Sequence, residues 1–506
     1  MPSERGLHPL SFVFHLGGQL RQLVVPGLVL LVGAGSAGYQ WQVWVLILLA
    51  PSALLALLRC LSVRYRLDAA EIVISSGFIF RNERHIPYAR IQNVDAVQNV
   101  AHRLFGVVDV RMETGGGDEP EAALRVLPRA ALDDIRERVF AGRATSAAAI
   151  DGAVAAPQPA EAARTLLRLR ARDLLLAGFI DSRGWIIVSA AIGLLWEAGL
   201  FDPALDAIAG EDVDGRGFIR QAFRALAGGG MPSLDRIALA IGGFVLLLIV
   251  IRVLSMIWSL VRLYGFHLER RGQDLRAEFG FLTRVMMTIP IGRVQTLTIR
   301  EGPLHRWFGC AMVRVDSAGS DATGERGAAK RESLAPLVAR GALPELLHEV
   351  LPEVDLTTID WQPIDPRGFR RAIKISLVFY ALLTVPFVVM LKWWTPGLLA
   401  LLWAWAWLDV TMTIRHLGWA LADRAVLFKS GWVVREVSVA RFSKLQAVTM
   451  TESPFDRRYR MAAVDVDTAG AGDLHHRLGV PYLARETAER LREQLTRQAA
   501  STSFRW

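Results

Sequence analysis

The sequence predicts an α+β membrane protein with six transmembrane helices in three hairpins and three cytoplasmic β-domains, each closed by a C-terminal helix. Three observations predict this fold class. The chain of 506 residues is 52% hydrophobic and has a mean hydropathy of +0.30, which is too apolar for an ordinary soluble multidomain protein. Its apolar stretches occur in three pairs. One strand-and-turn signature follows each pair, and such internal repetition indicates tandem domains.

The repeated signature contains a basic residue that is followed two positions later by glutamine. The copies at 86–92 and 289–295 read Ile-Pro-x-x-Arg-(Ile/Val)-Gln, and a degraded third copy ends at 444–448. In each copy a glycine stands 13 residues before the basic residue, and an arginine and then another glycine follow at further intervals of 13. The members are the basic residues Arg90, Arg293 and Lys444, the glutamines Gln92, Gln295 and Gln446, the first glycines Gly77, Gly280 and Gly431, and the later arginines Arg103, Arg306 and Arg457.

The three apolar pairs predict the membrane spans. A span requires about 20 predominantly apolar residues, and flanking residues extend the shorter stretches to that length. Trp393 and Trp394, in the turn of the third pair, suit an interfacial belt. The stretches are Leu23–Ala37 with Trp41–Leu58, Trp185–Phe201 with Ile237–Val261, and Ile373–Leu391 with Pro396–Ile414.

Basic residues flank the predicted hairpins on the side of the β-domains. The opposite loops are poor in them: 38–40 has none, the third loop has Lys392, and 202–235 has three against six acidic residues. The positive-inside rule therefore places both termini and all three β-domains in the cytoplasm. The sequence predicts a multi-pass protein of the inner (plasma) membrane.

These patterns divide the chain into eight segments. Period-two alternation, as in Val107–Glu113, predicts half-buried antiparallel strands, and each repeat ends in a helix that opens near a proline, Pro128, Pro344 or Pro481. The segments are an N-terminal cytoplasmic or interfacial stretch at 1–22, hairpin 1 at 23–58, β-domain 1 at 59–141, a linker with an interfacial helix at 142–172, hairpin 2 at 173–262 with the extracytoplasmic loop 202–235, β-domain 2 at 263–355, a linker with hairpin 3 at 356–414, and β-domain 3 at 415–506.

Together these residues resemble the bacterial pleckstrin-homology (PH) domain family, also called the membrane-flanked domain. The resemblance rests on Ile86–Gln92 and Ile289–Gln295 and on the downstream runs Arg103–Gly106 and Arg306–Gly309. Leu7–Leu10 also resembles the opening of the three-repeat members. The resemblance covers nearly the full chain and implies PH-like β-barrel or sandwich domains that bind lipid head groups or peptides. The third copy departs from the motif, with Arg441 in place of the proline, Lys444 in place of the arginine and Arg460 in place of the glycine, although its outer spacing is intact.

Two interpretations of the motif remain open. The motif arginine and glutamine could form a recognition surface, because arginine offers planar donors to carboxylate or phosphate and the glutamine amide lies on the same strand face. Alternatively, the two side chains pair with backbone groups or a neighbouring carboxylate and fix a strand edge inside each domain. We expect the later arginines to be structural or juxtamembrane.

Three ionisable residues, Glu197, Arg252 and Asp409, fall within or near predicted spans. Burying such groups in a bilayer is costly and often marks a functional position. A proton or ion relay would require the three side chains to converge in the helix bundle. A transporter or export component that uses the six-helix bundle is therefore the alternative function.

Signatures of catalysis are missing from the sequence. It contains no Walker glycine loop, HExxH, GxSxG or cysteine pair at zinc spacing, so we expect no enzyme, no metal and no cofactor. The net charge of +9 is spread along the chain, which favours an anionic membrane surface over nucleic acid. We therefore predict an integral membrane scaffold or recognition protein in a cell-envelope role. Its expected partners are anionic lipids of the inner leaflet, and a second membrane protein with the same domain type or another copy of itself.

Overall fold

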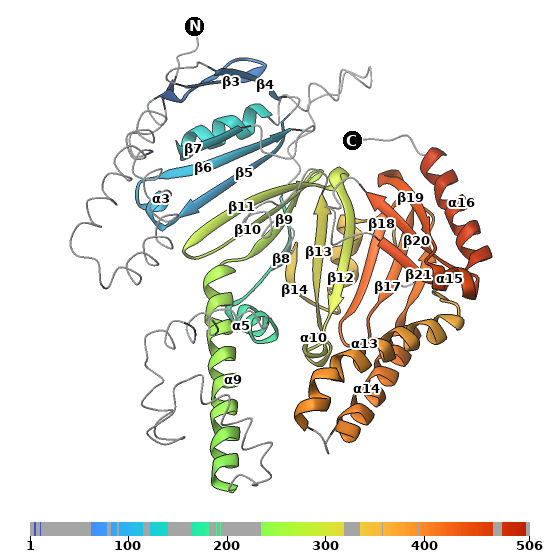
Figure 1. Ribbon diagram of the computed structural model, residues 1–506. Coiled ribbons are helices and arrows are strands. Elements are labelled where there is room, and N and C mark those ends of the chain that lie inside the picture. Colours follow the sequence, from blue (N-terminus) through green and yellow to red (C-terminus); the bar gives the residue numbers. More distant parts are fainter. Residues whose placement is uncertain are drawn as a thin grey trace. The chain divides into compact units, whose positions relative to one another are not determined.

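The computed structural model describes most of the β-domains and part of the helical segments (Figure 1). The described residues are 62–77, 82–88, 91–114, 122–139, 163–181, 234–317, 334–356, 358–391, 395–468 and 478–501, with isolated positions at 5, 6, 11, 189 and 193. The chain forms two compact units. The first unit comprises Met1–Leu166 and His267–Gly292, and the second comprises Leu167–Phe266 and Arg293–Arg505.

The first repeat forms a β-sandwich in the first unit. One layer is a four-stranded sheet of β1 (Arg5–Gly6), β2 (Arg64–Leu67), β3 (Glu71–Ser76) and β4 (Asn82–Pro87). The other layer contains β5 (Ile91–Asn99), β6 (Val107–Thr114) and β7 (Ala122–Pro128), and a helix at 129–139 follows. Both layers and the helix contribute to one core, in which Ile72, Met112 and Ile135 are fully buried. Apolar side chains that alternate along each strand are buried in this way between two packed layers.

The second layer of this sandwich continues into the next repeat. β5 pairs antiparallel with β11 (Thr283–Pro290), which is the third strand of the second repeat. A seven-stranded sheet results, in the order β7-β6-β5-β11-β10-β9-β8. Its remaining strands are β8 (Arg164–Arg168), β9 (His267–Arg271) and β10 (Asp274–Phe279).

The second unit repeats this arrangement with the second and third repeats. β12 (Val294–Glu301), β13 (Cys310–Ser317) and β14 (Ala335–Ala339) precede α12 (Leu343–Val350). β12 pairs antiparallel with β18 (Arg435–Arg441) of the third repeat. The sheet has the order β14-β13-β12-β18-β17-β16-β15. Its outer strands are β15 (Gln362–Pro363), β16 (Gly418–Leu421) and β17 (Ala425–Ser430).

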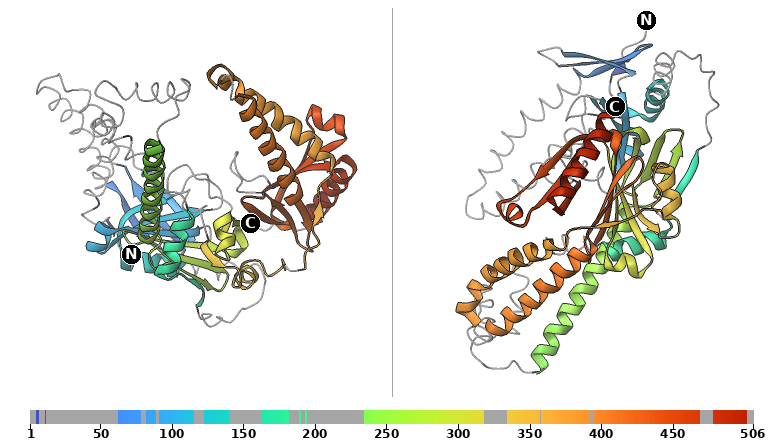
Figure 2. Two further views of the ribbon diagram at one scale, coloured as in Figure 1. Left: turned by 90° about the horizontal axis from the view of Figure 1, so that it is seen from below. Right: turned by 90° about the vertical axis from the view of Figure 1, so that its right-hand side faces the viewer.

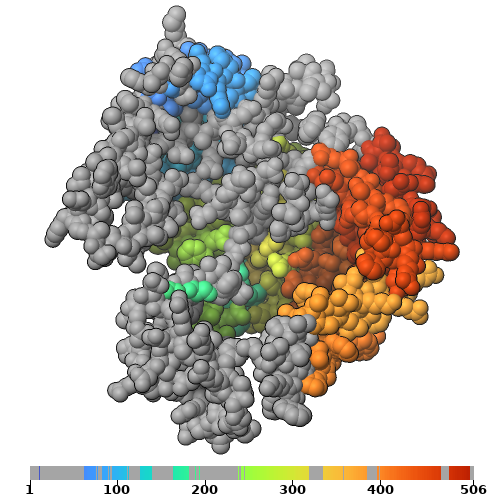
Figure 3. Space-filling view, viewed as in Figure 1, coloured from blue at the N-terminus to red at the C-terminus, as the bar shows by residue number. Residues whose placement is uncertain are grey.

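The third repeat completes its own sandwich with a three-stranded sheet. This sheet consists of β19 (Leu445–Thr451), β20 (Met461–Thr468) and β21 (Leu478–Ala484), and α16 (Arg485–Ser501) follows. α16 buries Ala488, Leu491 and Leu495 in the core, and its outer face is exposed (Figure 3, red). A helix therefore ends each repeat, as predicted. Pro344 lies at the start of α12, whereas Pro481 lies inside β21 rather than at a helix start.

The described helices that lie in or next to the predicted membrane hairpins belong to the second unit. They are α5 (Ala171–Ile180), α9 (Leu234–Arg262) and the side-by-side helices α13 (Arg367–Leu391) and α14 (Thr395–His416) (Figure 2, orange). Within the described ranges, one helical segment, Ile241–Arg262 of α9, is long and apolar enough to cross a membrane. The first predicted pair, and nearly all of Trp185–Phe201, lie outside the described residues. The prediction of six transmembrane helices is therefore not confirmed.

Candidate functional site: the joins between repeats

The two places where neighbouring repeats pair, called here the first join (β5 with β11) and the second join (β12 with β18), have the same register. In the first join Thr283 lies opposite Asn99, and in the second Arg435 lies opposite Glu301. Equivalent positions differ by 203 residues (293 − 90) between the first two repeats and by 151 (444 − 293) between the last two. Residue 434 of the third repeat is equivalent to residue 283, and residue 302 of the second repeat is equivalent to residue 99. The pair 434–302 continues the observed register of the second join by one position from the pair 435–301. The joins are therefore two copies of one interface.

One arginine in each join donates to the neighbouring repeat. Nη1 of Arg103 donates to the carbonyl oxygen of Phe281 at 3.0 Å, and Nη1 of Arg306 donates to that of Trp432 at 2.9 Å. The two acceptors are equivalent positions (281 + 151 = 432). Charge-assisted hydrogen bonds of this kind are stronger than neutral ones. The structure thus places two of the three later arginines between neighbouring repeats.

The third of these arginines, Arg457, has a different environment. It lies in α15 (Pro454–Tyr459), and its side chain is exposed. Within the described part of the chain its guanidinium has no hydrogen-bond or ion-pair partner. The third repeat therefore carries, with an exposed side chain, the arginine that is equivalent to the donors of the two joins.

Large exposed apolar side chains are adjacent in sequence to the donor and acceptor residues of both joins. Leu104, at the end of α3 (Val100–Leu104), is 79% exposed, and the equivalent Trp307, at the end of α10 (Pro303–Trp307), is 83% exposed. The next residues in the chain, Phe105 and Phe308, are also exposed. On the acceptor side, Phe281, Leu282 and Val433 are exposed as well. Exposed apolar side chains therefore stand beside the arginine contact in both joins.

Two of the predicted intramembrane residues connect helices to the second join. Arg252 of α9 donates to the carbonyl oxygen of Phe179 at 2.7 Å, and the Phe179 ring packs edge-to-face on Phe308 with centroids 6.1 Å apart. Asp409 of α14 accepts from Nε1 of Trp432 at 2.8 Å. The structure therefore gives Arg252 and Asp409 separate partners. Glu197 lies outside the described residues.

The motif itself forms the crossover from the third to the fourth strand in the second and third repeats. In the second repeat it runs through the 3-10 turn η2 (Ile291–Arg293) into β12, and in the third through η4 (Phe442–Lys444) into β19. Gln295 is 4% exposed, and its amide donates to the carbonyl oxygen of Arg293 at 3.4 Å. Gln446 is exposed on β19. Arg90 and the side chain of Gln92 lie outside the described residues, so a ligand-binding role of the motif stays a prediction.

Three cations gather near this crossover in the second unit. Lys444 is 6% exposed, and burial, together with the charges of Arg441 and Arg293, lowers the pKa of Lys444. Burial also lowers the pKa of Arg441, whose Nη2 donates to the carbonyl oxygen of Val350 at 3.0 Å. The arginine that replaces the motif proline thus contacts the C-terminal end of α12.

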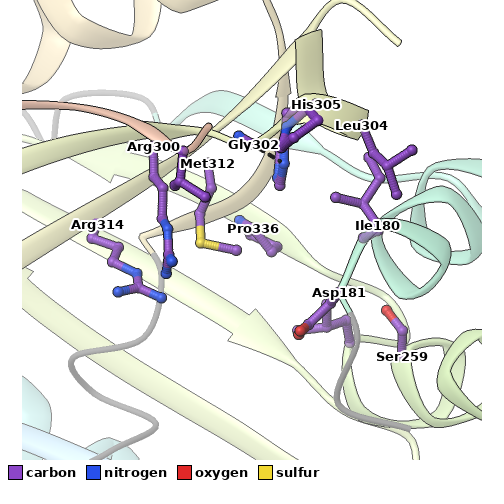
Figure 4. Close-up of a pocket in the computed structure, with 14 residues that line it drawn as sticks. Ile180, Asp181, Ser259, Arg300, Gly302, Leu304, His305, Met312, Arg314 and Pro336 are labelled. Carbon is purple, nitrogen blue, oxygen red and sulfur yellow. Dashed lines mark hydrogen bonds between the residues drawn. The ribbon is translucent and has the colours of Figure 1, made fainter. Parts of the chain in front are cut away.

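A cavity of about 420 Å³ lies in the second unit beside the second join. Figure 4 shows Arg300 and Arg314 on one side and Asp181 and Ser259 on the other. Arg300 also pairs with Glu436 across the join, with Nε and Oε1 3.1 Å apart. Burial and the charge of Arg300 lower the pKa of His305, which lines the same cavity. The cavity therefore has two arginines on one wall, one of them paired with Glu436, and lies against the C-terminal end of α9.

The described residues offer little for metal or thiol chemistry. Among them, no group of three or more His, Cys, Asp or Glu side chains is placed to hold a metal ion. Cys310 is buried in the second unit, and burial raises the pKa of its thiol to about 11. A thiol in this state is a poor nucleophile at neutral pH.

Comparison with known proteins agrees with the three repeats. The model of the bacterial PH domain family matches at residues 23–142, 227–350 and 373–499. Among curated proteins, the chain is similar to the UPF0699 transmembrane protein YdbT of Bacillus subtilis (strain 168), with 22% identity over 423 residues that cover 81% of this chain and 80% of YdbT. No solved structure matches the chain significantly. The predicted resemblance to three-repeat, YdbT-like members is confirmed.

Proposed function

Because the chain belongs to the bacterial PH domain family, we propose that it is an integral membrane scaffold whose PH domains recognise proteins by pairing strands at the edges of their sheets. One observation carries this proposal: two joins inside the chain use this mode with the same strands and the same register. Main-chain hydrogen bonds along a sheet edge give affinity, and the alternating side chains give specificity. The proposed role is non-enzymatic.

Several features support a membrane location for this scaffold. The segment Ile241–Arg262 is long and apolar enough to span a bilayer, and the similar protein YdbT is named a transmembrane protein. The exposed Leu104 and Trp307 suit contact with the interfacial region of a bilayer. The basic flanks of the helices favour PH domains on the cytoplasmic side. The transporter alternative stays a prediction. The contacts of Arg252 and Asp409 suit a structural role rather than a shared relay.

Amide hydrogen exchange tests whether the sheet edges have partners in the membrane. We expect β4 and β19 to exchange more slowly in protein extracted with its native lipids and neighbours in polymer nanodiscs than in dilute purified protein, because a paired edge protects its amides. β11 and β18, which pair on both sides within the chain, are the internal controls and are expected to exchange equally in both samples. Equal exchange of β4 and β19 in the two samples would argue against recognition at the edges.

Binding of an anionic lipid head group is a second candidate, favoured by the cavity beside the second join. Arg300 and Arg314 present two guanidinium groups to this cavity (Figure 4), and arginine matches the geometry of a phosphate group. Ser259 and Leu263 line the cavity near the C-terminal end of the candidate membrane span. A head group at that end of the helix would lie within reach of both arginines.

A soluble lipid can test this second candidate. We expect the full chain in detergent to bind a short-chain phosphatidic acid in preference to phosphatidylcholine, as measured by titration calorimetry. Arg314→Gln should weaken this binding roughly tenfold or more, since a hydrogen bond to a charged group contributes about 1.5–3 kcal/mol. The matched control is Met312→Leu, which changes an apolar residue of the same cavity at nearly constant volume. Unchanged affinity in Arg314→Gln would remove the cavity as a head-group site.

A further inference from the structure

Among the described strands, two edges lack the neighbour that their equivalents have. β4 is the third strand of the first repeat and ends its sheet, whereas β11 and β18, the third strands of the other repeats, each pair with a fourth strand. β19 is the fourth strand of the third repeat and also ends its sheet, whereas β5 and β12 each pair with a third strand. The chain therefore presents one half of the join at each end of the repeat series.

The exposure of β19 shows what the pairing partner would cover. β12 is buried over six successive residues, Val294–Ile299, because strands pair with it on both sides. The equivalent stretch of β19 exposes Gln446, Ala447 and Thr449. β19 contains no charged residue and no proline, although proteins usually protect free edges with such residues. This edge is therefore suited to pairing.

The local geometry of β19 also matches that of the strands that pair. β5, β12 and β19 each have a register shift one residue after the strand begins, between Ile91 and Asn93, Val294 and Thr296, and Leu445 and Ala447. A bulge at this point turns the strand in the same way in all three repeats. Arg457 adds the exposed arginine that is equivalent to the donor of each internal join.

We propose that β19 of one molecule pairs antiparallel with β4 of a second copy of this chain, and that the copies thereby assemble head to tail. The proposal rests on the proposed function and names its partner. The register of the internal joins predicts which residues pair. In the second join residue 298 lies opposite residue 438, and the equivalent positions are Thr449 in β19 and Arg84 in β4. Thr449 therefore lies opposite Arg84, and Thr451 lies opposite Asn82. The interface joins two different surfaces of the same chain, which produces rings or open arrays rather than closed dimers.

The second copy is the occupant that the observations favour. The strand that fits β4 by position is a fourth strand of this family, and the internal joins show that fourth strands of this chain accept third strands of this chain. Position 449 corresponds to Thr298, whose hydroxyl lies 3.3 Å from that of Ser438 in the second join. Ser438 corresponds to Arg84. Side chains at these positions therefore touch when the strands pair.

Cysteine cross-linking tests the register. Full chains with Cys60 and Cys310 replaced by alanine carry either Arg84→Cys or Thr449→Cys, have different tags and are reconstituted together in vesicles. A short bifunctional thiol reagent is expected to join the two kinds of chain into a product of twice the mass. Either kind of chain alone should give no such product. Glu83→Cys with Thr449→Cys is the matched control, because neighbouring strand residues point to opposite faces. A product with Glu83→Cys as strong as with Arg84→Cys would overturn the register.

Charge at position 449 tests the interface without a reagent. Thr449 is exposed, so substitution there should leave the fold intact, as checked by the melting profile of each variant. Thr449→Lys places a like charge opposite Arg84 and should weaken self-association about two- to fivefold, whereas Thr449→Glu places an opposite charge there and should not weaken it. Self-association is measured by single-molecule photobleaching in vesicles across a range of protein densities. An equal response to lysine and glutamate would contradict the proposed pairing.

The outcomes separate this inference from the proposed function. A monomeric chain without cross-links overturns pairing with a second copy. A chain that carries both Arg84→Cys and Thr449→Cys and forms the cross-link within itself also overturns it. If β4 and β19 are still protected from exchange in native nanodiscs, a different protein covers the edges and the scaffold proposal stands. If the edges are unprotected there as well, both proposals fail.

Discussion

Replacing Gly431 by alanine is expected to destabilise the third repeat by about 3 kcal/mol or more. Gly431 has φ +76, and a Cβ atom built there would lie 1.9 Å from the carbonyl oxygen of Val434. Left-handed backbone strain for an L-residue accounts for roughly 1–2 kcal/mol, and relief of the clash requires the turn between β17 and β18 to move. β18 is the strand that pairs with β12, so displacement of this turn should also weaken the second join.

The measurement is thermal unfolding of the full chain in detergent, combined with hydrogen exchange of β17 and β18. A loss of this size should lower the transition of the third repeat by about 10 °C or more. The matched control is Gly309→Asn: Gly309 has φ +62, but a Cβ atom there meets nothing within 4 Å. Its equivalent Arg460 already has φ 54, so the control should cost at most about 1 kcal/mol. Equal losses in the two variants would show that the turn can relax.

The repeat spacing places this turn at the same position in all three repeats. Gly77, Gly280 and Gly431 all have positive φ, and each stands 13 residues before the basic position of its repeat. Local signals of this kind predict strands and turns well because they depend on neighbouring residues. The same reasoning explains why the third copy tolerates Arg460: the site needs a left-handed backbone but has open space for a side chain.

The joins could not be predicted from the same patterns. Arg103 donates to a carbonyl oxygen 178 residues away, and no local spacing contains that partner. β12 and β19 have similar alternation in sequence, yet Gln295 is buried and Gln446 is exposed, because only β12 has strands on both sides. Strand pairing between repeats depends on which edges meet, which is a property of the folded chain. A signal was nevertheless present, since the later arginine recurs in all three copies beside exposed apolar residues in two of them.

Hydropathy identified the positions of helices in the described part of the chain. α13 and α14 occupy the third predicted pair, and the segment Ile241–Arg262 of α9 is long and apolar enough to cross a membrane. α13 begins with Arg367, Arg370, Arg371 and Lys374, so its first turns are polar. Side chains in these turns contact the third repeat, which indicates that the start of α13 lies against the domain.

This contact between α13 and the third repeat is held by an ion pair of low exposure. The Arg371 and Asp456 side chains are 18% and 11% exposed, and their Nε and Oδ1 atoms are in contact. Nη2 of Arg371 also donates to Oδ2 of Asp456 at 3.1 Å, and the guanidinium lies over the Tyr482 ring at 5.1 Å. Asp456 further accepts from the backbone N–H of Ser453 at 2.9 Å at the start of α15. One carboxylate therefore joins a helix cap to the helical hairpin.

Asp456→Ala is expected to cost about 3–5 kcal/mol, because removal of one partner leaves a largely buried charge without its counter-ion. Asp456→Asn should cost less, since the amide can still cap α15 while the charge pair is lost. The matched control is Lys374→Met, which removes the exposed contact of Lys374 Nζ with the Tyr459 hydroxyl at 2.7 Å and should cost at most about 1 kcal/mol. A double-mutant cycle of Asp456→Ala with Arg371→Met, followed by thermal unfolding, measures the coupling. Additive losses would mean that the two side chains stabilise α13 and the third repeat independently, and the ion pair would then not connect the helical hairpin to its PH domain.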